Sequence, residues 1–455
     1  GRTIDDLQLN ALRLARRAPE GQRLMISANL LLYRQEPEAL AMAESLTTRF
    51  PADPRALATL GHARWTVGDW AGSVEAIERA IALDSAAELS SSAVCNVCDD
   101  FRALAQTYTW WDSLPAASRT MLRYTKVRPG PSDASYNLAF ISARMGDSAG
   151  AFGAFRQSVA IGGGDPGHSK IRIQLTLGDY EDVEREVHPL LSSSAAGEWA
   201  DGANYLLIAL RNEGRLQDAI ELHQTGWLPG FPAVPRNPND FDAGILALER
   251  GEARSAAAVF HEKALRVQPR WSPGLQARVR TWNRTLEGMA LAAAGDTAAV
   301  RALIDSVEQS GRRSAYGRDR RAHHYLRGLM LVAQHRDEDA VPEFRAAIHS
   351  PNLGFTRVNH ELARALLRLG RPTEAIATLQ SSLRGEIDAS NLYITRTDLH
   401  ETLAQAFAAA GQHDSAAHHY RAVVNAWQRA DPIYRGRRAR AVEWLAQNVG
   451  MQSSR

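Results

Sequence analysis

Apolar side chains recur along most of the chain at intervals of three and four residues, the spacing of one face of an α-helix. Between successive stretches lies a short polar step that usually contains glycine, such as Gly68-Asp69-Trp70 or Gly214-Arg215-Leu216. Glycine ends a helix where the backbone needs a left-handed residue, and the next helix begins within about two residues. The pattern therefore predicts pairs of helices joined by tight turns.

The turns recur with a period close to 34 residues, with insertions. Glycine marks eight of them: Gly68, Gly146, Gly178, Gly214, Gly251, Gly295, Gly370 and Gly411. Equivalent turns without glycine fall at Arg34, Asp112 and His335. After each turn comes a small residue and, one helical turn later, often a bulky one, as at Ala151 and Phe155. We predict an all-α protein, a right-handed α-solenoid of about eleven helix-turn-helix units with terminal helices.

Two segments resemble a known repeat closely. They are Leu60-Gly61 with Gly68-Asp69-Trp70 and Ala80-Ile81-Ala82-Leu83-Asp84, and Glu262-Lys263-Ala264-Leu265-Arg266-Val267-Gln268-Pro269. Both resemble the tetratricopeptide repeat (TPR), a helix-turn-helix unit of about 34 residues, and the resemblance extends over residues 20–430. The segments 321–328, 390–393 and 420–432 are similar to the long TPR arrays that, in GC-rich bacteria, follow serine/threonine kinase domains or DNA-binding domains of transcriptional activators. That resemblance implies a sensory or scaffolding region.

The chain is expected to divide into four parts: a leading helix (1–19), an N-terminal array (20–233), a C-terminal array (234–430), and a capping helix with a tail (431–455). Insertions fall at 84–94, 227–240 and 312–321, and the proline-rich second one predicts a flexible joint. The third insertion is rich in arginine and is expected to be solvated or to contact a partner. The arginines of the last helix are expected to point outward.

Composition narrows the functional classes. The chain has 455 residues, and its 53 basic and 51 acidic residues leave a net charge of +2, so nucleic acid is not an expected partner. No apolar run approaches the roughly 18 residues that span a bilayer, so membrane insertion is not expected. Cys95 and Cys98 are a possible disulfide, a pair of buried thiols, or a redox or metal site. This spacing and the missing initiator methionine favour an extracytoplasmic (secreted or periplasmic) location.

Three catalytic motifs are present only in part. His335-Arg336-Asp337 resembles the kinase catalytic loop, but Pro342 stands where a metal-binding asparagine is required. His400-Glu401 lacks the second histidine of a zinc protease. The sequence Gly146-Asp147-Ser148-Ala149-Gly150 falls on a turn between helices, whereas a hydrolase elbow follows a strand. We therefore predict no enzyme, no cofactor and no metal site.

In a helical-repeat solenoid the first helix of each unit lines the concave surface. Candidate partner-binding residues there are Trp65, Tyr136, Phe140, Arg211, Phe241, Trp282, Tyr325, Arg357, His360 and Arg364. The predicted function is a non-enzymatic scaffold, a regulatory or sensory module that binds a protein or peptide in its concave groove. The last three residues of that set favour an acidic segment. The alternative is a structural protein whose apolar ends stack into a filament or ring, so that its partner is another copy of itself.

Overall fold

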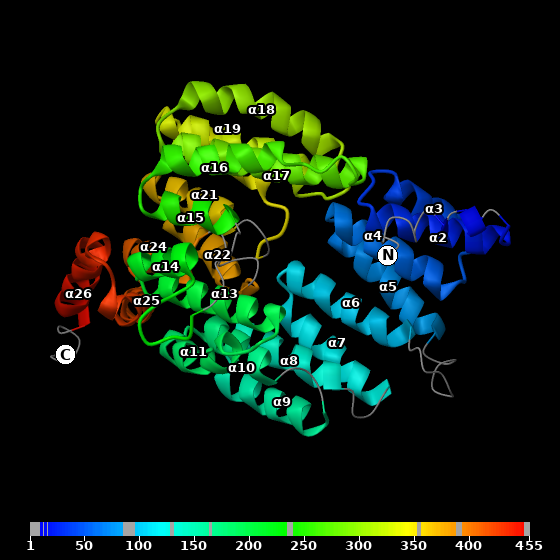
Figure 1. Ribbon diagram of the computed structural model, residues 1–455, viewed down its shortest axis with the longest axis horizontal. Helices are drawn as coiled ribbons and strands as arrows, with labels where there is room; N and C mark the ends of the chain where they lie inside the picture. The colour runs from blue at the N-terminus through cyan, green and yellow to red at the C-terminus, as the bar shows by residue number, and fades with distance from the viewer. Residues whose placement is uncertain are drawn as a thin grey trace.

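A computed structural model describes residues 10–11, 13–15, 17–84, 96–127, 132–162, 166–233, 240–352, 356–387 and 394–449 (Figure 1). Within these ranges every regular element is helical. The helices of the first six pairs are α2 (Glu20–Tyr33), α3 (Ala39–Arg49), α4 (Pro54–Val67), α5 (Trp70–Asp84), α6 (Asn96–Trp110), α7 (Leu114–Val127), α8 (Ser132–Arg144), α9 (Ser148–Ala160), α10 (Pro166–Leu177), α11 (Tyr180–Glu186) with α12 (His188–Leu191), α13 (Ala196–Asn212) and α14 (Leu216–Thr225).

The next five pairs are α15 (Asp240–Glu249), α16 (Ala253–Leu265), α17 (Pro273–Ala293), α18 (Thr297–Arg312), α19 (Ala322–Ala333), α20 (Asp337–Ala347), α21 (Thr356–Arg368), α22 (Pro372–Leu383), α24 (Arg396–Ala409) and α25 (His413–Ala426). Short 3-10 turns η2 (Asp319–Arg321), η3 (Trp427–Arg429) and η4 (Pro432–Tyr434) precede α19 or α26 (Arg435–Val449). The predicted all-α solenoid of about eleven TPR-like pairs is confirmed. The division of the chain at residue 233 stays a prediction.

Close approach of the two helices in a pair rests on a small residue facing a bulky one. At three places the small residue is a glycine, and an added Cβ would come too near the ring or branched side chain sixteen residues later: Gly61 against Ile77 (2.4 Å), Gly244 against Phe260 (2.5 Å) and Gly328 against Phe344 (2.5 Å). Contacts below 3 Å force a shift, so these positions select glycine. The bulky partner, such as Phe344, is the large residue that follows a turn in the sequence pattern, but the glycine that it faces lies on the first helix of the pair.

The predicted turns adopt the left-handed conformation. All eight glycines have φ between 69° and 89°. Asp112 (φ 60°) and His335 (φ 59°) hold it without glycine, as does Gln35 (φ 56°). The first turn is therefore one residue later than predicted, because Arg34 is still right-handed (φ −76°). Glycine adopts this conformation freely, whereas a side chain makes it less favourable, so these three turns each carry a backbone cost, which is smaller for aspartate than for most residues.

The chain winds through one superhelical turn, and its later pairs then lie against the earlier ones. In Figure 1, one end of α17 reaches toward α3 and α4. The Ser272 hydroxyl donates to the Arg34 carbonyl (2.5 Å), and Asn352 Nδ2 donates to the Thr109 carbonyl (2.7 Å). These contacts join residues 238 and 243 positions apart. We call the boundary between the turns of pairs 1 to 6 and the loops that follow pairs 7 to 11 the seam.

The centre of the seam is charged and largely buried. The Asp112 carboxylate accepts from Ser381 Oγ (2.7 Å), Asn352 Nδ2 (3.1 Å) and Arg384 Nε (2.8 Å). One turn further along, Arg144 Nε donates to the Arg384 carbonyl (2.7 Å), and only 4% of the Arg144 side chain is exposed. A buried charged group that loses its partner destabilises the fold strongly. Pairs 1 to 6, the first layer, and pairs 7 to 11, the second layer, therefore stabilise each other.

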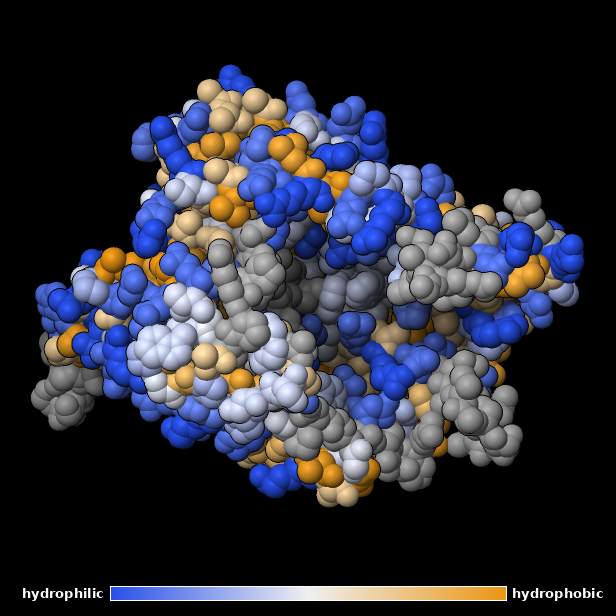
Figure 2. Space-filling model, in the orientation of Figure 1, coloured by the Kyte–Doolittle hydropathy of each residue, from blue (hydrophilic) through white to orange (hydrophobic). Residues whose placement is uncertain are grey.

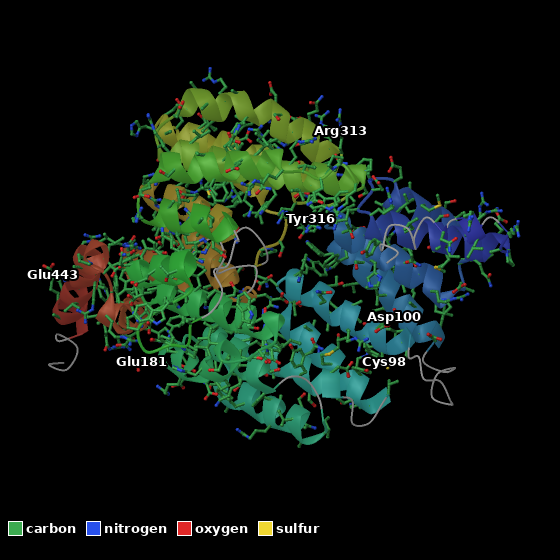
Figure 3. All side chains as sticks on the ribbon, in the orientation of Figure 1. Cys98, Asp100, Glu181, Arg313, Tyr316 and Glu443 are labelled. Carbon is green, nitrogen blue, oxygen red and sulfur yellow. The ribbon has the colours of Figure 1, made fainter. Side chains whose placement is uncertain are left out.

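Aromatic rings fill the seam beside this charged centre. Trp65 packs against Trp110 with the ring planes tilted by 39° and the ring centroids 4.2 Å apart, and His349 packs at 5.1 Å from both Trp70 and Tyr316. Tyr316 lies where the second layer approaches α4 (Figure 3). Tyr316 is buried, as are Ala315 and Asp319, so the insertion at 312–321 is not a solvated loop as expected. The insertion is folded against α4 of the second pair, because its Gly317 amide donates to the Thr66 carbonyl (2.9 Å).

At its far end the seam holds the capping helix. Asp431 N donates to the Gly214 carbonyl (2.9 Å), and the Asp431 carboxylate accepts from Gln217 N (2.7 Å) at the start of α14. A Cβ on Gly214 would lie 2.8 Å from Ala430. The face in Figure 2 is polar over most of its area, with small scattered apolar groups. No helix in the described ranges combines the length and hydropathy needed to cross a membrane.

Candidate functional site

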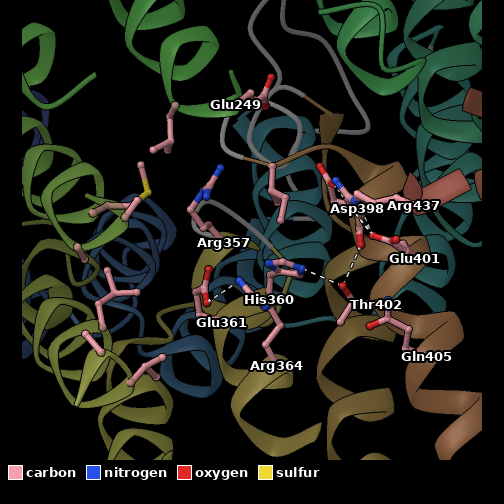
Figure 4. A pocket seen from close by; sticks show the side chains of 18 of the residues that line it. Glu249, Arg357, His360, Glu361, Arg364, Asp398, Glu401, Thr402, Gln405 and Arg437 are labelled. Carbon is pink, nitrogen blue, oxygen red and sulfur yellow. Dashed lines mark hydrogen bonds and ion pairs between the residues drawn. The ribbon is translucent and has the colours of Figure 1, made fainter. Parts of the chain in front are cut away.

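The concave side of the later pairs encloses a cavity of about 750 Å³, which we call the cup (Figure 4). Its lining comes from the first helices of pairs 7 to 11, with η4 and α26 completing it. The lining residues are Leu248, Glu249, Met289, Ala292, Ala293, Tyr325, Leu329, Val332, Ala333, Arg357, His360, Glu361, Arg364, Ile394, Asp398, Glu401, Thr402, Gln405, Ile433, Tyr434, Arg437 and Arg440. A cavity of this size and mixed lining is typical of a ligand site.

One side of the cup carries an ion-pair cluster. Arg437 of α26 donates through Nε to Glu401 (2.9 Å) and through its terminal nitrogen to Asp398 (2.6 Å). Burial favours the neutral form of Asp398, but Arg437 and a hydrogen bond from Thr395 outweigh it and hold the pKa below its usual value. Asp398 is therefore ionised at neutral pH, and both carboxylates are already bound to Arg437.

His360 stands beside this cluster as a neutral ring. Burial lowers the pKa of His360 to about 4, against the opposing effect of Glu361. Its Nε2 lies 2.9 Å from Thr402 Oγ1, which itself donates to the Asp398 carbonyl (3.1 Å). Since the Thr402 proton is used there, Nε2 carries the hydrogen and Nδ1 is the acceptor. Nδ1 is buried without a hydrogen-bond partner among the described residues.

Two further arginines project from α21, one turn to either side of His360. Arg364 lies 3.4 Å from Glu361, and half of its side chain (51%) is exposed, so this pair is weak. The Arg357 guanidinium points into the open space of the cup (Figure 4). Arg440 also lines the cup and makes no ion pair among the described residues. Arg357, Arg364 and Arg440 thus line the cup beside the Arg437 cluster.

Four of the predicted site residues come together in this cup: Tyr325, Arg357, His360 and Arg364. Tyr325 is fully buried, so it supports the wall more than it faces a ligand. Arg211 lies behind the wall, where its Nε donates to Glu249 (3.0 Å) and only 3% of its side chain is exposed. Whether any of these residues binds a partner stays a prediction.

The other predicted site residues lie elsewhere. Trp65 is packed on Trp110 in the seam, and Trp282 lies under the Arg318 guanidinium at 3.6 Å. Tyr136 and Phe140 form an edge-to-face pair at 4.7 Å, and Phe140 borders a separate cavity of about 340 Å³. Phe241 belongs to α15, but its side chain is outside the described part of the structure. The predicted concave residues therefore do not form one continuous groove.

Arg437 corrects the expectation that the arginines of the last helix point outward. Its guanidinium turns inward, over the Trp427 ring at 4.5 Å and onto the carboxylates of α24. A signal was present in the sequence: Asp398 and Glu401 are acidic residues three apart on a first helix, and such a pair on one face calls for a cation nearby. Their partner could not be inferred, because it comes from beyond the last pair.

The cysteines and possible metal ligands add no chemistry to the cup. Cys98 is buried at the start of α6, while Cys95 lies outside the described residues, so the possible disulfide between them stays a prediction. Within the described ranges no group of three or more His, Cys, Asp or Glu side chains is placed to hold a metal ion.

Neither a protein-family profile nor a curated protein matches this sequence. Among solved structures, the APC/C Cut9–Hcn1 hetero-tetramer matches 98% of this chain and 90% of its own at 12% identity, with a TM-score of 0.31. Naa15/Naa10 bound to HypK-THB matches 93% of this chain and 73% of its own at 15% identity (TM-score 0.25). The human IFIT1 dimer with PPP-AAAA matches 83% and 85% at 15% identity (TM-score 0.32). The likeness carries no conclusion about function, and the TPR-like assignment rests on the geometry of the pairs themselves.

Proposed function

We propose that the chain is a non-enzymatic interaction scaffold that binds a segment of a partner protein in the cup, as a regulatory or sensory module. The observation that carries this proposal is the cup itself, a cavity of about 750 Å³ lined by both apolar and charged side chains on the concave side of the later pairs. Concave surfaces of helical-repeat arrays are built to present such extended contacts. Arginine and large apolar side chains are frequent anchors of protein interfaces.

The test is site-specific photo-crosslinking in the organism of origin. A photoreactive phenylalanine at Gln405, which is exposed and lines the cup, should yield a covalent adduct with a partner protein. The same group at Arg301, an exposed position on α18 outside the cup, is the control. An adduct specific to Gln405 that is lost on Arg357→Gln with Arg364→Gln supports the proposal. No adduct at Gln405, or equal adducts at both positions, would overturn it.

A further inference from the structure

The last turns of the chain are held to the first layer by ion pairs. Arg429 of η3 donates through one terminal nitrogen to Glu184 of α11 and to Glu213 (2.8 Å), the residue that follows α13. These pairs join residues 245 and 216 positions apart. Beside them, the Asp431 carboxylate accepts from Gln217 N. The chain around η3 is therefore bound to the turn between α13 and α14.

Glu184 and Glu213 form a buried carboxyl pair. Their side chains are 13% and 5% exposed. One terminal nitrogen of Arg215, just before α14, lies 2.7 Å from Glu184 and 3.2 Å from Glu213, so the two carboxyl groups share Arg215 as well as Arg429. Carboxyl groups that meet at the same nitrogen atoms lie against each other, and a hydrogen bond between them requires a proton on one of them.

The carboxyl pair keeps this proton near neutral pH. Burial, with the charge of Glu184, raises the pKa of Glu213 to about 7 against the effect of Arg429. Burial also disfavours the charged form of Glu184, but the hydrogen bond from Arg215 outweighs burial and lowers the pKa of Glu184. The pair as a whole therefore holds one proton up to about pH 7 and releases it above that pH.

Other ionisable groups face the same place from the elements packed against the carboxyl pair. They are Asp179, Glu181 and Asp182 at the start of α11, Asp218 of α14, Arg396 and His400 of α24, and His418 of α25. Burial lowers the pKa of His400 well below its usual range and raises that of Tyr180 to about 12, so both stay neutral near pH 7. Asp179 and His418 line a cavity of about 550 Å³ together with Glu213 and Arg429, which makes them suitable controls.

We propose that the carboxyl pair is a proton-dependent contact that holds η3 and the capping helix against the first layer. With the proton bound, the two carboxyl groups and their two arginines fit together in a buried site. Loss of the proton leaves two carboxylates side by side there, and separation of η3 from α13 lets water reach them.

The sign of the pH dependence follows from the stronger binding of the proton in the closed contact. Acidic pH favours the closed contact, and its stability falls as the pH rises from about 4.5, the ordinary pKa of a glutamate, through about 7. Since η4 and α26 supply Ile433, Tyr434, Arg437 and Arg440 to the cup, opening of the contact also opens one side of the cup. The contact operates in the free protein, so it can be tested without a partner.

The test is hydrogen exchange of the whole chain followed by mass spectrometry at about pH 5 and pH 8, with each rate corrected for the chemical exchange rate at that pH. The protection of residues 427–441 should fall as the pH rises, by up to about 70-fold if opening restores the ordinary pKa of Glu213. Glu213→Gln mimics the protonated carboxyl and should give equal protection at both pH values. A parent protein without this fall, or an equal fall in Glu213→Gln, overturns the inference.

Further variants locate the effect. Arg429→Gln removes the bonds between η3 and the carboxyl pair and should lower the protection of residues 427–441 at both pH values. Asp179→Asn and His418→Gln change other groups that line the same cavity, so the pH dependence should remain. Exchange in α4 of the second pair reports on unfolding of the chain as a whole and should be the same in every variant. Unchanged protection in Arg429→Gln, or loss of the pH dependence in either control, also overturns the inference.

Discussion

Replacing Asp112 by glycine tests whether the seam stabilises the fold. The native residue has a left-handed backbone, and glycine there removes a strain of about 1 kcal/mol. The same change deletes the acceptor of bonds from Ser381, Asn352 and Arg384. Bonds to a charged acceptor contribute about 1.5–3 kcal/mol each, and the Arg384 pair is discounted because 38% of that side chain is exposed. With the Arg384 pair left out, the two remaining bonds and the relieved strain give an expected net loss of about 2–5 kcal/mol.

His335 provides the matched comparison. It has the same left-handed backbone (φ 59°) at the turn between α19 and α20 and is exposed, away from the seam. His335→Gly should therefore stabilise the protein by about 1 kcal/mol, the opposite sign to Asp112→Gly. Asp112→Asn keeps a side chain that tolerates the turn but loses the charge, and should fall between the two.

The assay is urea unfolding with hydrogen exchange followed by mass spectrometry. Unfolding of an array this long need not be two-state, so exchange in residues 346–352 reports on the seam directly. Asp112→Gly should speed exchange there, and His335→Gly should not. If Asp112→Gly stabilises the protein as much as His335→Gly does, the seam bonds contribute nothing and the argument for two interdependent layers is refuted.

Two further predictions concern buried groups of the same fold. Burial, with Arg318 and Arg321, lowers the pKa of His349 to about 3, so the ring is neutral in the folded protein. Its contribution to stability is complete above about pH 6.5, the pKa of an unfolded histidine, and falls as the pH drops toward 3. His349→Phe keeps the aromatic packing without the proton uptake. Between pH 7 and pH 5, urea titrations should show that its free energy of unfolding falls by up to about 2 kcal/mol less than that of the parent protein. Equal losses would mean that other groups cause the acid sensitivity. Gly328→Ala should destabilise the protein by about 1–3 kcal/mol because the added Cβ meets Phe344. Gly153→Ala lies within α9 with open space around it, and should stabilise the protein by about 0.5–1 kcal/mol. Thermal unfolding compares the two variants, and equal shifts in Tm would contradict the packing argument.

The pairs themselves were predictable because their determinants are local. The left-handed turns, eight of them at glycine, and the small residue that faces a bulky one sixteen positions later both lie within one unit, so a sequence period records them directly. Local signals set boundaries less well. The helix α17 begins at Pro273, because Ser272 caps it while the Ser272 hydroxyl also donates to the Arg34 carbonyl in the first pair.

The seam could not be predicted because its contacts cross about 240 residues, and half of the cup could not because Arg437 comes from beyond the last pair. Asn352 and Arg144 have nothing in their own units to distinguish them from surface residues, and only the fold supplies their partners. One clue was present in the turns. At this turn glycine would adopt the left-handed backbone at the lowest free-energy cost, yet the residue is Asp112. A residue that is kept despite a backbone cost indicates that its side chain makes a contact that glycine could not make. Arg357, His360 and Arg364 were found because they share one helix.

The seam also bears on how such a protein can change in length. Repeat arrays ordinarily gain or lose units freely, because each unit contacts only its neighbours. Here the helix ends at Arg34 and Thr109 must lie opposite Ser272 and Asn352. A duplicated or deleted pair between those points would shift every later loop out of register with its turn. The seam therefore fixes the number of pairs between its two ends. Only pairs that are added outside those ends leave its contacts unchanged.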